Sequence, residues 1–224
     1  MISKELQKRI LSSLVLIPLS IFFILQENIF FLFFLFILFL ATSFEWIKMN
    51  KKDVIKIIGI FYLFFSFSLS YLLRENLSIE IFFFILVICI STDLGGYIFG
   101  KIFKGPKLIK ISPKKTYAGV IGGFILSLTA ALIYTKSIAL SNSDILNLSI
   151  SENNILISDK LIFLFILFIS FISQVGDLTV SYFKRLAKVK DTGSLLPGHG
   201  GLLDRLDGII FAMPMSYLLI IYIK

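Results

Sequence analysis

The stretch "IFFLFFLFILFLATSF", residues 29–44, decides the class of fold, because it contains no charged residue along its whole length. A helix needs about 20 largely apolar residues to cross the hydrocarbon core of a bilayer. The chain repeats this pattern. We predict seven spans, at 10–26, 29–45, 54–73, 80–100, 118–135, 161–182 and 208–223. These runs lack the period-two alternation of a membrane β-barrel, so helices are favoured over strands.

The composition excludes a soluble domain. Of the 224 residues, 57% are hydrophobic and only 16% are charged, whereas soluble domains carry about 25% charged residues. The sequence therefore predicts an all-α, polytopic integral membrane bundle, with residues 1–224 as one domain. We interpret residues 1–90 as membrane scaffold and residues 91–224 as the catalytic portion, because the polarity that needs explaining gathers in the second part. The lone Cys89 allows no internal disulfide.

The loop charges predict which way the chain crosses the membrane. Segments 1–9, 45–56, 101–117 and 182–207 carry net charges of +2, +2, +6 and +2, and the loops between them each carry −1. Cytoplasmic loops are enriched in lysine and arginine, so the N-terminus and these basic loops are predicted to be cytoplasmic. The basic residues flank membrane spans, which favours anionic lipid headgroups and phosphates as partners and no nucleic acid.

Two aspartates lie within predicted spans. Asp93 sits in "ICISTDLGGYIFG" and Asp177 in "FISQVGDLTVSYF". A carboxylate in the hydrocarbon region costs about 2.5–3.5 kcal/mol even on lenient insertion scales, so such residues usually mark a functional site. At helical spacing Asp177, Ser181 and Lys184 share one side. Two alternatives remain open at this point: a structural ion pair with a nearby lysine, and an ion path through a transporter.

The segment "ISPKKT", residues 111–116, is a candidate phosphate cradle. Two lysines, Lys114 and Lys115, and two hydroxyls, Ser112 and Thr116, precede the fifth span, whose first turn adds free N–H groups. A basic patch that binds lipid headgroups without specificity is the alternative interpretation.

The segment "KRLAKVKDTGSLLPGHGGLLDRLDG", residues 184–208, combines cations, acids and glycines. Asp204 and Asp207 are three apart and share one face of a helix. The glycines at 198, 200 and 201 allow tight turns and close approach of a ligand. Carboxylates beside lysines suit Mg²⁺ with a polyphosphate, rather than zinc. His199 is interpreted as a donor to phosphate, a general acid or base, or a loop residue.

The blocks "SYFKRLAKVKDTGSLLPGHGGLLDRLD" (181–207), "GDLTVS" (176–181) and "ISPKKT" resemble, in order, the signature of the phosphatidate cytidylyltransferases, also called CDP-diacylglycerol synthases. Asp93 with Tyr97 and Gly100 resembles the block that precedes them. The chain departs from the family pattern at Ala118 and Val180, where an acid is common.

The resemblance implies an enzyme of phospholipid biosynthesis that joins CTP to phosphatidate, giving CDP-diacylglycerol and pyrophosphate. The resemblance implies CTP, phosphatidate and membrane lipids as partners. The helix-rich, positive-inside design fits a bacterial inner membrane with the active site facing the cytoplasm, and an organelle membrane is the alternative. A homodimer and a second metal ion are left open. The alternatives are a CTP-dependent transferase or kinase for another lipid phosphate or a polyprenol, and an ion-coupled transporter.

The resemblance also implies roles for individual residues. Asp177 and Asp204 would hold Mg²⁺. The catalytic group is Asp177, Asp204, Lys184, Arg185, His199 and Asp207. The substrate-binding group is Asp93, Ser112, Lys114, Lys115, Thr116, Ser181, Lys190, Asp191, Gly200, Gly201 and Arg205.

Overall fold

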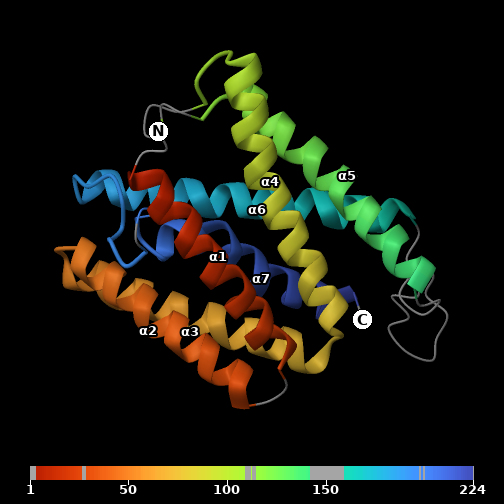
Figure 1. Ribbon diagram of the computed structural model, residues 1–224, viewed down its shortest axis with the longest axis horizontal. Coiled ribbons are helices and arrows are strands. Elements are labelled where there is room, and N and C mark those ends of the chain that lie inside the picture. Colours follow the sequence, from red (N-terminus) through yellow and green to blue (C-terminus); the bar gives the residue numbers. More distant parts are fainter. Residues whose placement is uncertain are drawn as a thin grey trace.

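The computed structural model describes residues 4–26, 29–108, 112, 115–141, 159–196, 198 and 200–223. Their main elements are seven α-helices (Figure 1): α1 (Lys4–Leu25), α2 (Ile29–Met49), α3 (Asp53–Asn76), α4 (Ile79–Phe103), α5 (Tyr117–Ser141), α6 (Asp159–Leu186) and α7 (Leu203–Ile223). Each predicted span is confirmed as a helix, extended at one or both ends. Six are long and apolar enough to cross a membrane, and α1 contributes a shorter apolar helix, Arg9–Leu25. The all-α membrane bundle is thus confirmed.

The helices pack mainly as antiparallel neighbours. Helix α4 packs on α5, α6 on α7, and α7 on α3, which in turn packs on α2. Figure 1 shows α4 and α5 on one side and α2 and α3 on the other, with α6 and α7 between them. This arrangement brings the start of α7 beside the end of α6, where most of the sequence-predicted site residues lie.

Glycines allow α4 and α5 to approach closely. A Cβ atom built on Gly95 would lie 2.3 Å from the carbonyl oxygen of Gly122, and one built on Gly119 would lie 2.8 Å from that of Gly96. Small residues at such crossings let helix backbones meet in a membrane, where no hydrophobic effect drives the helices together. The close packing fixes the start of α5 against the end of α4.

An apolar cluster ties α2, α3, α6 and α7 together at the polar end of the bundle. Its buried members are Trp46, Met49, Leu63, Val180, Leu203 and Ile210. The Trp46 indole N–H donates to the carbonyl of Ile55 at 3.0 Å, and its ring contacts that of Phe183 with centroids 5.0 Å apart. Val180, which is 4% exposed, therefore contributes packing.

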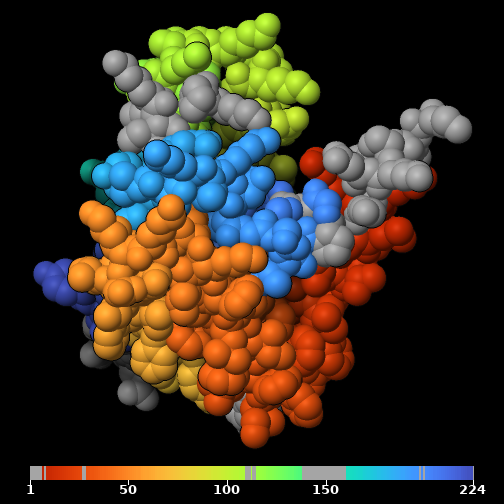
Figure 2. Space-filling model, turned by 90° about the vertical axis from the view of Figure 1, so that its left-hand side faces the viewer, coloured from red at the N-terminus to blue at the C-terminus, as the bar shows by residue number. Residues whose placement is uncertain are grey.

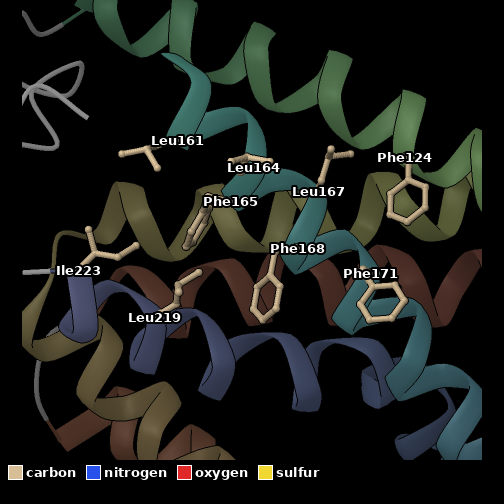
Figure 3. Close-up of a pocket in the computed structure, with 9 residues that line it drawn as sticks. All are labelled: Phe124, Leu161, Leu164, Phe165, Leu167, Phe168, Phe171, Leu219 and Ile223. Carbon is tan, nitrogen blue, oxygen red and sulfur yellow. The ribbon is translucent and has the colours of Figure 1, made fainter. Parts of the chain in front are cut away.

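A cavity of about 680 Å³ lies among α5, α6 and α7 (Figure 3). Its lining is entirely apolar and includes Phe124, Phe168 and Leu219. Burying a charge without a partner is costly, so phosphate chemistry is excluded from this cavity and belongs where charged side chains gather.

Candidate active site

Asp177 forms the first of two acid–lysine pairs. Its Oδ2 atom lies 2.5 Å from Nζ of Lys115, in the segment before α5. Its Oδ1 atom accepts a hydrogen bond from the Ser181 hydroxyl, one helical turn along α6, at 3.3 Å. The predicted stacking of Asp177 and Ser181 is confirmed. Both members of the ion pair remain partly exposed, at 24% for Lys115 and 31% for Asp177, so a ligand can reach this carboxylate.

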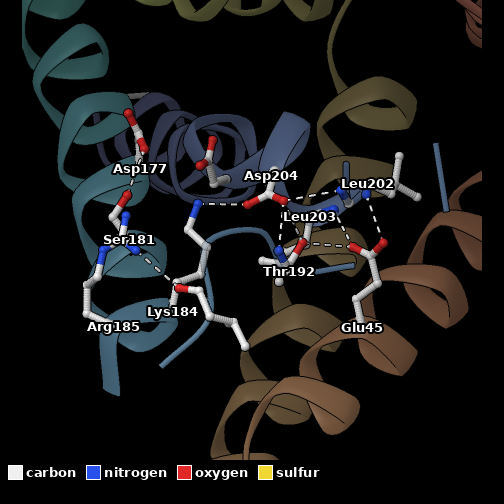
Figure 4. Close-up of polar contacts among 12 residues, drawn as sticks. Glu45, Asp177, Ser181, Lys184, Arg185, Thr192, Leu202, Leu203 and Asp204 are labelled. Carbon is white, nitrogen blue, oxygen red and sulfur yellow. Dashed lines mark hydrogen bonds and ion pairs between the residues drawn. The ribbon is translucent and has the colours of Figure 1, made fainter. Parts of the chain in front are cut away.

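Asp204 forms the second pair, with Lys184 (Figure 4). Its Oδ1 atom lies 2.7 Å from Nζ of Lys184. Its Oδ2 atom accepts from the backbone N–H of Thr192 at 2.8 Å, from the Thr192 hydroxyl at 3.1 Å and from the N–H of Gly201 at 3.2 Å. Asp204 therefore joins the end of α6, the following loop and the first turn of α7.

A third group of charges surrounds Asp177. Asp93 on α4 interacts electrostatically with Asp177, Lys115 and Arg205. Asp207 on α7 interacts with Asp177, Asp93 and Lys184. The Asp207 side chain is buried, and its Oδ1 atom accepts from the N–H of Gly208 at 2.9 Å. The structure thus brings acids from α4, α6 and α7 into one electrostatic neighbourhood with the cations.

The loop between α6 and α7 turns tightly, as its glycines predicted. Leu196 and Gly200 exchange two backbone hydrogen bonds, of 3.0 and 3.2 Å. Gly198 and Gly200 have φ angles of 77° and 89°, which glycine adopts without the steric cost that other residues meet. A Cβ atom on Gly201 would lie 2.0 Å from the Thr192 hydroxyl oxygen. The glycines are therefore required by the shape of this loop.

The other predicted site residues are placed less directly. Arg185 donates from Nη1 to the carbonyl of Val189 at 3.2 Å. The loop residues Lys190 and Asp191 are exposed. His199 and Lys114 lie outside the described residues. Their assignments stay predictions.

The described residues of the predicted phosphate cradle, Ser112, Lys115 and Thr116, lie directly before α5. The carbonyl of Ser112 accepts from the N–H of Lys115 at 3.0 Å. The Thr116 hydroxyl oxygen accepts from the N–H of Gly119 at 3.1 Å, which satisfies one of the free N–H groups at a helix start. That hydroxyl retains its own proton, which it can donate to a phosphate oxygen.

Sequence reasoning missed Glu45, near the end of α2. It was counted only as a loop charge, yet its side chain is 1% exposed and accepts hydrogen bonds from Thr192, Leu202 and Leu203. The signal in the sequence was the position of Glu45, an acid that directly follows the uncharged run at residues 29–44. Arg9 of α1 also reaches the loop, donating from Nε to the carbonyl of Gly198 at 2.7 Å. Glu45 and Arg9 both lie within residues 1–90, which were predicted to be scaffold. The division into scaffold and catalytic portions stays a prediction.

The donor set suits a metal that takes few protein ligands. Within the described residues, no three or more His, Cys, Asp or Glu side chains are grouped closely enough to hold a metal ion. Mg²⁺ is commonly bound by one or two carboxylates together with substrate phosphates and water. Asp177 and Asp204, each beside a lysine, are compatible with that mode and not with an all-protein cage.

The fold and site define a helical membrane protein with paired acids and lysines at one end of the bundle. Residues 52–223 match the cytidylyltransferase family. The chain therefore belongs to the cytidylyltransferase family.

Curated relatives agree with this assignment. A phosphatidate cytidylyltransferase of Rickettsia felis is 35% identical over 214 residues, covering 93% of this chain and 89% of the relative. One of Rickettsia conorii is 36% identical over 220 residues, covering 96% and 91%. One of Brucella melitensis is 36% identical over 163 residues, covering 71% of this chain and 54% of the relative. These similarities do not favour the transporter interpretation.

Proposed function

We propose that this membrane protein is a phosphatidate cytidylyltransferase, which converts CTP and phosphatidate into CDP-diacylglycerol and pyrophosphate. The observation that carries the proposal is the placement of two acid–lysine pairs, Asp177–Lys115 and Asp204–Lys184, in one charged neighbourhood at the end of an apolar bundle. The named relatives support the same activity.

The reaction needs charge neutralisation and alignment more than a side-chain nucleophile. A phosphate oxygen of phosphatidate forms a bond to the α-phosphorus of CTP, and the bond between that phosphorus and the bridging oxygen to the β-phosphate breaks. Pyrophosphate leaves with the electron pair. Two anions must meet, so cations that hold both in line lower the barrier.

The acid–lysine pairs supply the cations and keep them in place before the substrate arrives. When CTP binds, Lys115 and Lys184 would donate to its phosphate oxygens in place of their carboxylate partners. Asp177 and Asp204 would then hold Mg²⁺, which neutralises phosphate charge and polarises the phosphoryl oxygens when it is bound. Arg205, Arg185 and Lys114 would add positive charge around the same phosphates.

The proposal extends to location. The basic segments favour a cytoplasmic active site in a bacterial inner membrane, where CTP arrives from water and the lipid from the bilayer. The side of the membrane that the site faces can be tested with Lys190→Cys, because the native Cys89 is buried. A membrane-impermeant thiol reagent should label the introduced thiol only from the cytoplasmic face.

The activity is tested with purified protein, cytosine-labelled CTP and phosphatidate in detergent micelles, with and without Mg²⁺. We expect labelled CDP-diacylglycerol that depends on Mg²⁺ and is greatly reduced in Asp177→Asn. A polyprenyl phosphate is offered in parallel with the same label, and a polyprenol is offered with γ-³²P-labelled CTP, because a kinase would transfer the γ-phosphate and not the cytidine part. Label in either of these, with none in the phosphatidate reaction, would contradict the proposed acceptor.

A further inference from the structure

We propose that Glu45 is a positioning residue that holds the active-site loop and the start of α7 in register with Asp204. The inference rests on the proposed function and deepens it, because it assigns a role in the reaction to the N-terminal part of the chain. Glu45 is not a catalytic residue in this proposal, since it acts through Thr192 and the backbone.

The Glu45 carboxylate is bound entirely by uncharged donors in the part of the chain that the structure describes. Its Oε1 atom accepts from the N–H of Leu202 at 3.0 Å, and its Oε2 atom accepts from the N–H of Leu203 at 2.9 Å. These are the free amides at the beginning of α7, where the helix dipole favours a negative charge. A carboxylate on α2 thereby fixes a helix that starts about 160 residues later.

The loop is shaped around this carboxylate. A Cβ atom on Gly193 would lie 2.5 Å from Oε1 of Glu45, and one on Gly201 would lie 2.8 Å from Oε2. Side chains at either position would displace Glu45 or the loop. Gly193 and Gly201, which lie on either side of the turn in this loop, therefore enclose the Glu45 carboxylate. The carboxylate occupies a specific buried site.

Thr192 connects the buried Glu45 carboxylate to Asp204. Its hydroxyl oxygen lies 3.1 Å from Oε2 of Glu45 and 3.1 Å from Oδ2 of Asp204. A hydroxyl has a single proton, so it donates fully to one carboxylate at a time. If Asp204 turned toward bound Mg²⁺ and nucleotide, the Thr192 hydroxyl would keep Glu45 as an acceptor, which would hold the loop in place.

This geometry requires a carboxylate and not merely a side chain of the same size. In Glu45→Gln one oxygen becomes an NH₂ group, which would face a backbone N–H or the Thr192 hydroxyl and leave buried donors unsatisfied. Groups that orient metal-binding side chains typically change activity or metal affinity by about 10- to 100-fold when they are mutated. We therefore expect kcat of Glu45→Gln to fall by about 10- to 100-fold and its half-saturating Mg²⁺ concentration to rise.

The test compares Glu45→Gln, Thr192→Val and Thr192→Ser with a matched control, Thr42→Val. Thr42 is also buried on α2, but among the described residues its hydroxyl donates within its own helix, to the carbonyls of Leu38 and Phe39. We expect Thr192→Val to reproduce the Mg²⁺ shift of Glu45→Gln and Thr192→Ser, which keeps the hydroxyl, to reverse most of it. Thr42→Val should leave kcat and the Mg²⁺ dependence unchanged.

A second readout separates this proposal from the proposed function. Hydrogen exchange of the amides at 202 and 203 should be faster in Glu45→Gln than in the wild type and unchanged in Thr42→Val, whether or not the assay detects turnover. Unchanged exchange would overturn the proposal even if the enzyme is active. Lower kcat with an unchanged Mg²⁺ dependence would also overturn it, because it would indicate a purely structural role. Wild-type protein without turnover would count against the proposed function, and exchange would still decide how Glu45 acts.

Discussion

The two acid–lysine pairs of the site consist of the same residue types but differ in their hydrogen-bond partners and in their exposure. Asp177 accepts from Lys115 and Ser181, and its side chain is 31% exposed. Asp204 accepts from Lys184, from the Thr192 amide and hydroxyl, and from Gly201, and its side chain is 10% exposed. The segment after α6 that contributes Thr192 lies across the ends of α2 and α3 (Figure 2, blue over orange).

Because of this difference, we expect Asp204 to contribute to both folding and catalysis, and Asp177 mainly to catalysis. Asp204 is both a predicted metal ligand and the anchor of the loop, so its loss should affect folding and catalysis together. Asp177 is a predicted metal ligand in an open position, so its loss should affect catalysis with little structural cost. Surface-accessible ion pairs contribute little to stability, whereas breaking a buried pair leaves an uncompensated charge.

The largest effect is expected for Asp204→Asn. Lys184 loses its buried counter-charge, and an amide replaces an oxygen that accepts three hydrogen bonds. Breaking a buried pair costs about 3–5 kcal/mol, and removing a preorganised electrostatic group costs about 10²–10³-fold in rate. Turnover should be lost and the thermal midpoint in detergent should fall. A variant near wild-type in rate would exclude Asp204 as a ligand.

Asp177→Asn tests the more exposed of the two acid–lysine pairs. We expect a rate loss of about 10²-fold with a thermal midpoint close to that of the wild type, because this pair is partly exposed. Unfolding and turnover are measured on the same preparation. If the midpoint fell as far as in Asp204→Asn, the proposed difference between the two pairs would be wrong.

Lys115→Met removes the cation of the open pair. Lys115 would bind CTP phosphates, so we expect KM for CTP to rise about tenfold, which corresponds to roughly 1.4 kcal/mol. KM for phosphatidate should change less. Steady-state rates at varied CTP and fixed lipid give the answer, and an effect confined to the lipid KM would reassign Lys115 to the other substrate.

Gly201→Ala removes no charged group and changes the packing of the loop around Glu45 and Thr192. Its new methyl group would meet the Thr192 hydroxyl and Glu45, and overpacking of this kind costs about 1–3 kcal/mol. Gly96→Ala is the matched control, because the nearest atom to its Cβ would be 3.8 Å away. Equal thermal midpoints for the two variants would show that the loop yields easily and is not an anchor.

Local pattern predicted the helices and part of the site, and it failed where contacts join distant segments. The apolar runs predicted all seven helices, since burial in a membrane requires only length and composition. Helical spacing predicted that Ser181 would lie beside Asp177, which the structure confirms. The alternative of an ion pair with a nearby lysine is met at Asp177, whose carboxylate lies beside Lys115.

The role of Glu45 was not predictable in this way. Its partners lie 147 to 158 positions away along the chain, and periodicity within one helix carries no information about such contacts. The sequence likewise predicts only that Gly201 allows a tight turn, whereas the structure shows that Gly201 and Gly193 leave room for the Glu45 carboxylate.

The central claim is that the protein transfers a cytidylyl group, and parallel reactions with α-³²P- and γ-³²P-labelled CTP test it most directly. Both are run with phosphatidate and Mg²⁺, and label is followed into lipid and into pyrophosphate. We expect the α label to enter the lipid and the γ label to appear only in pyrophosphate. Transfer of the γ label to lipid would mean that a kinase reaction occurs, and would contradict the account.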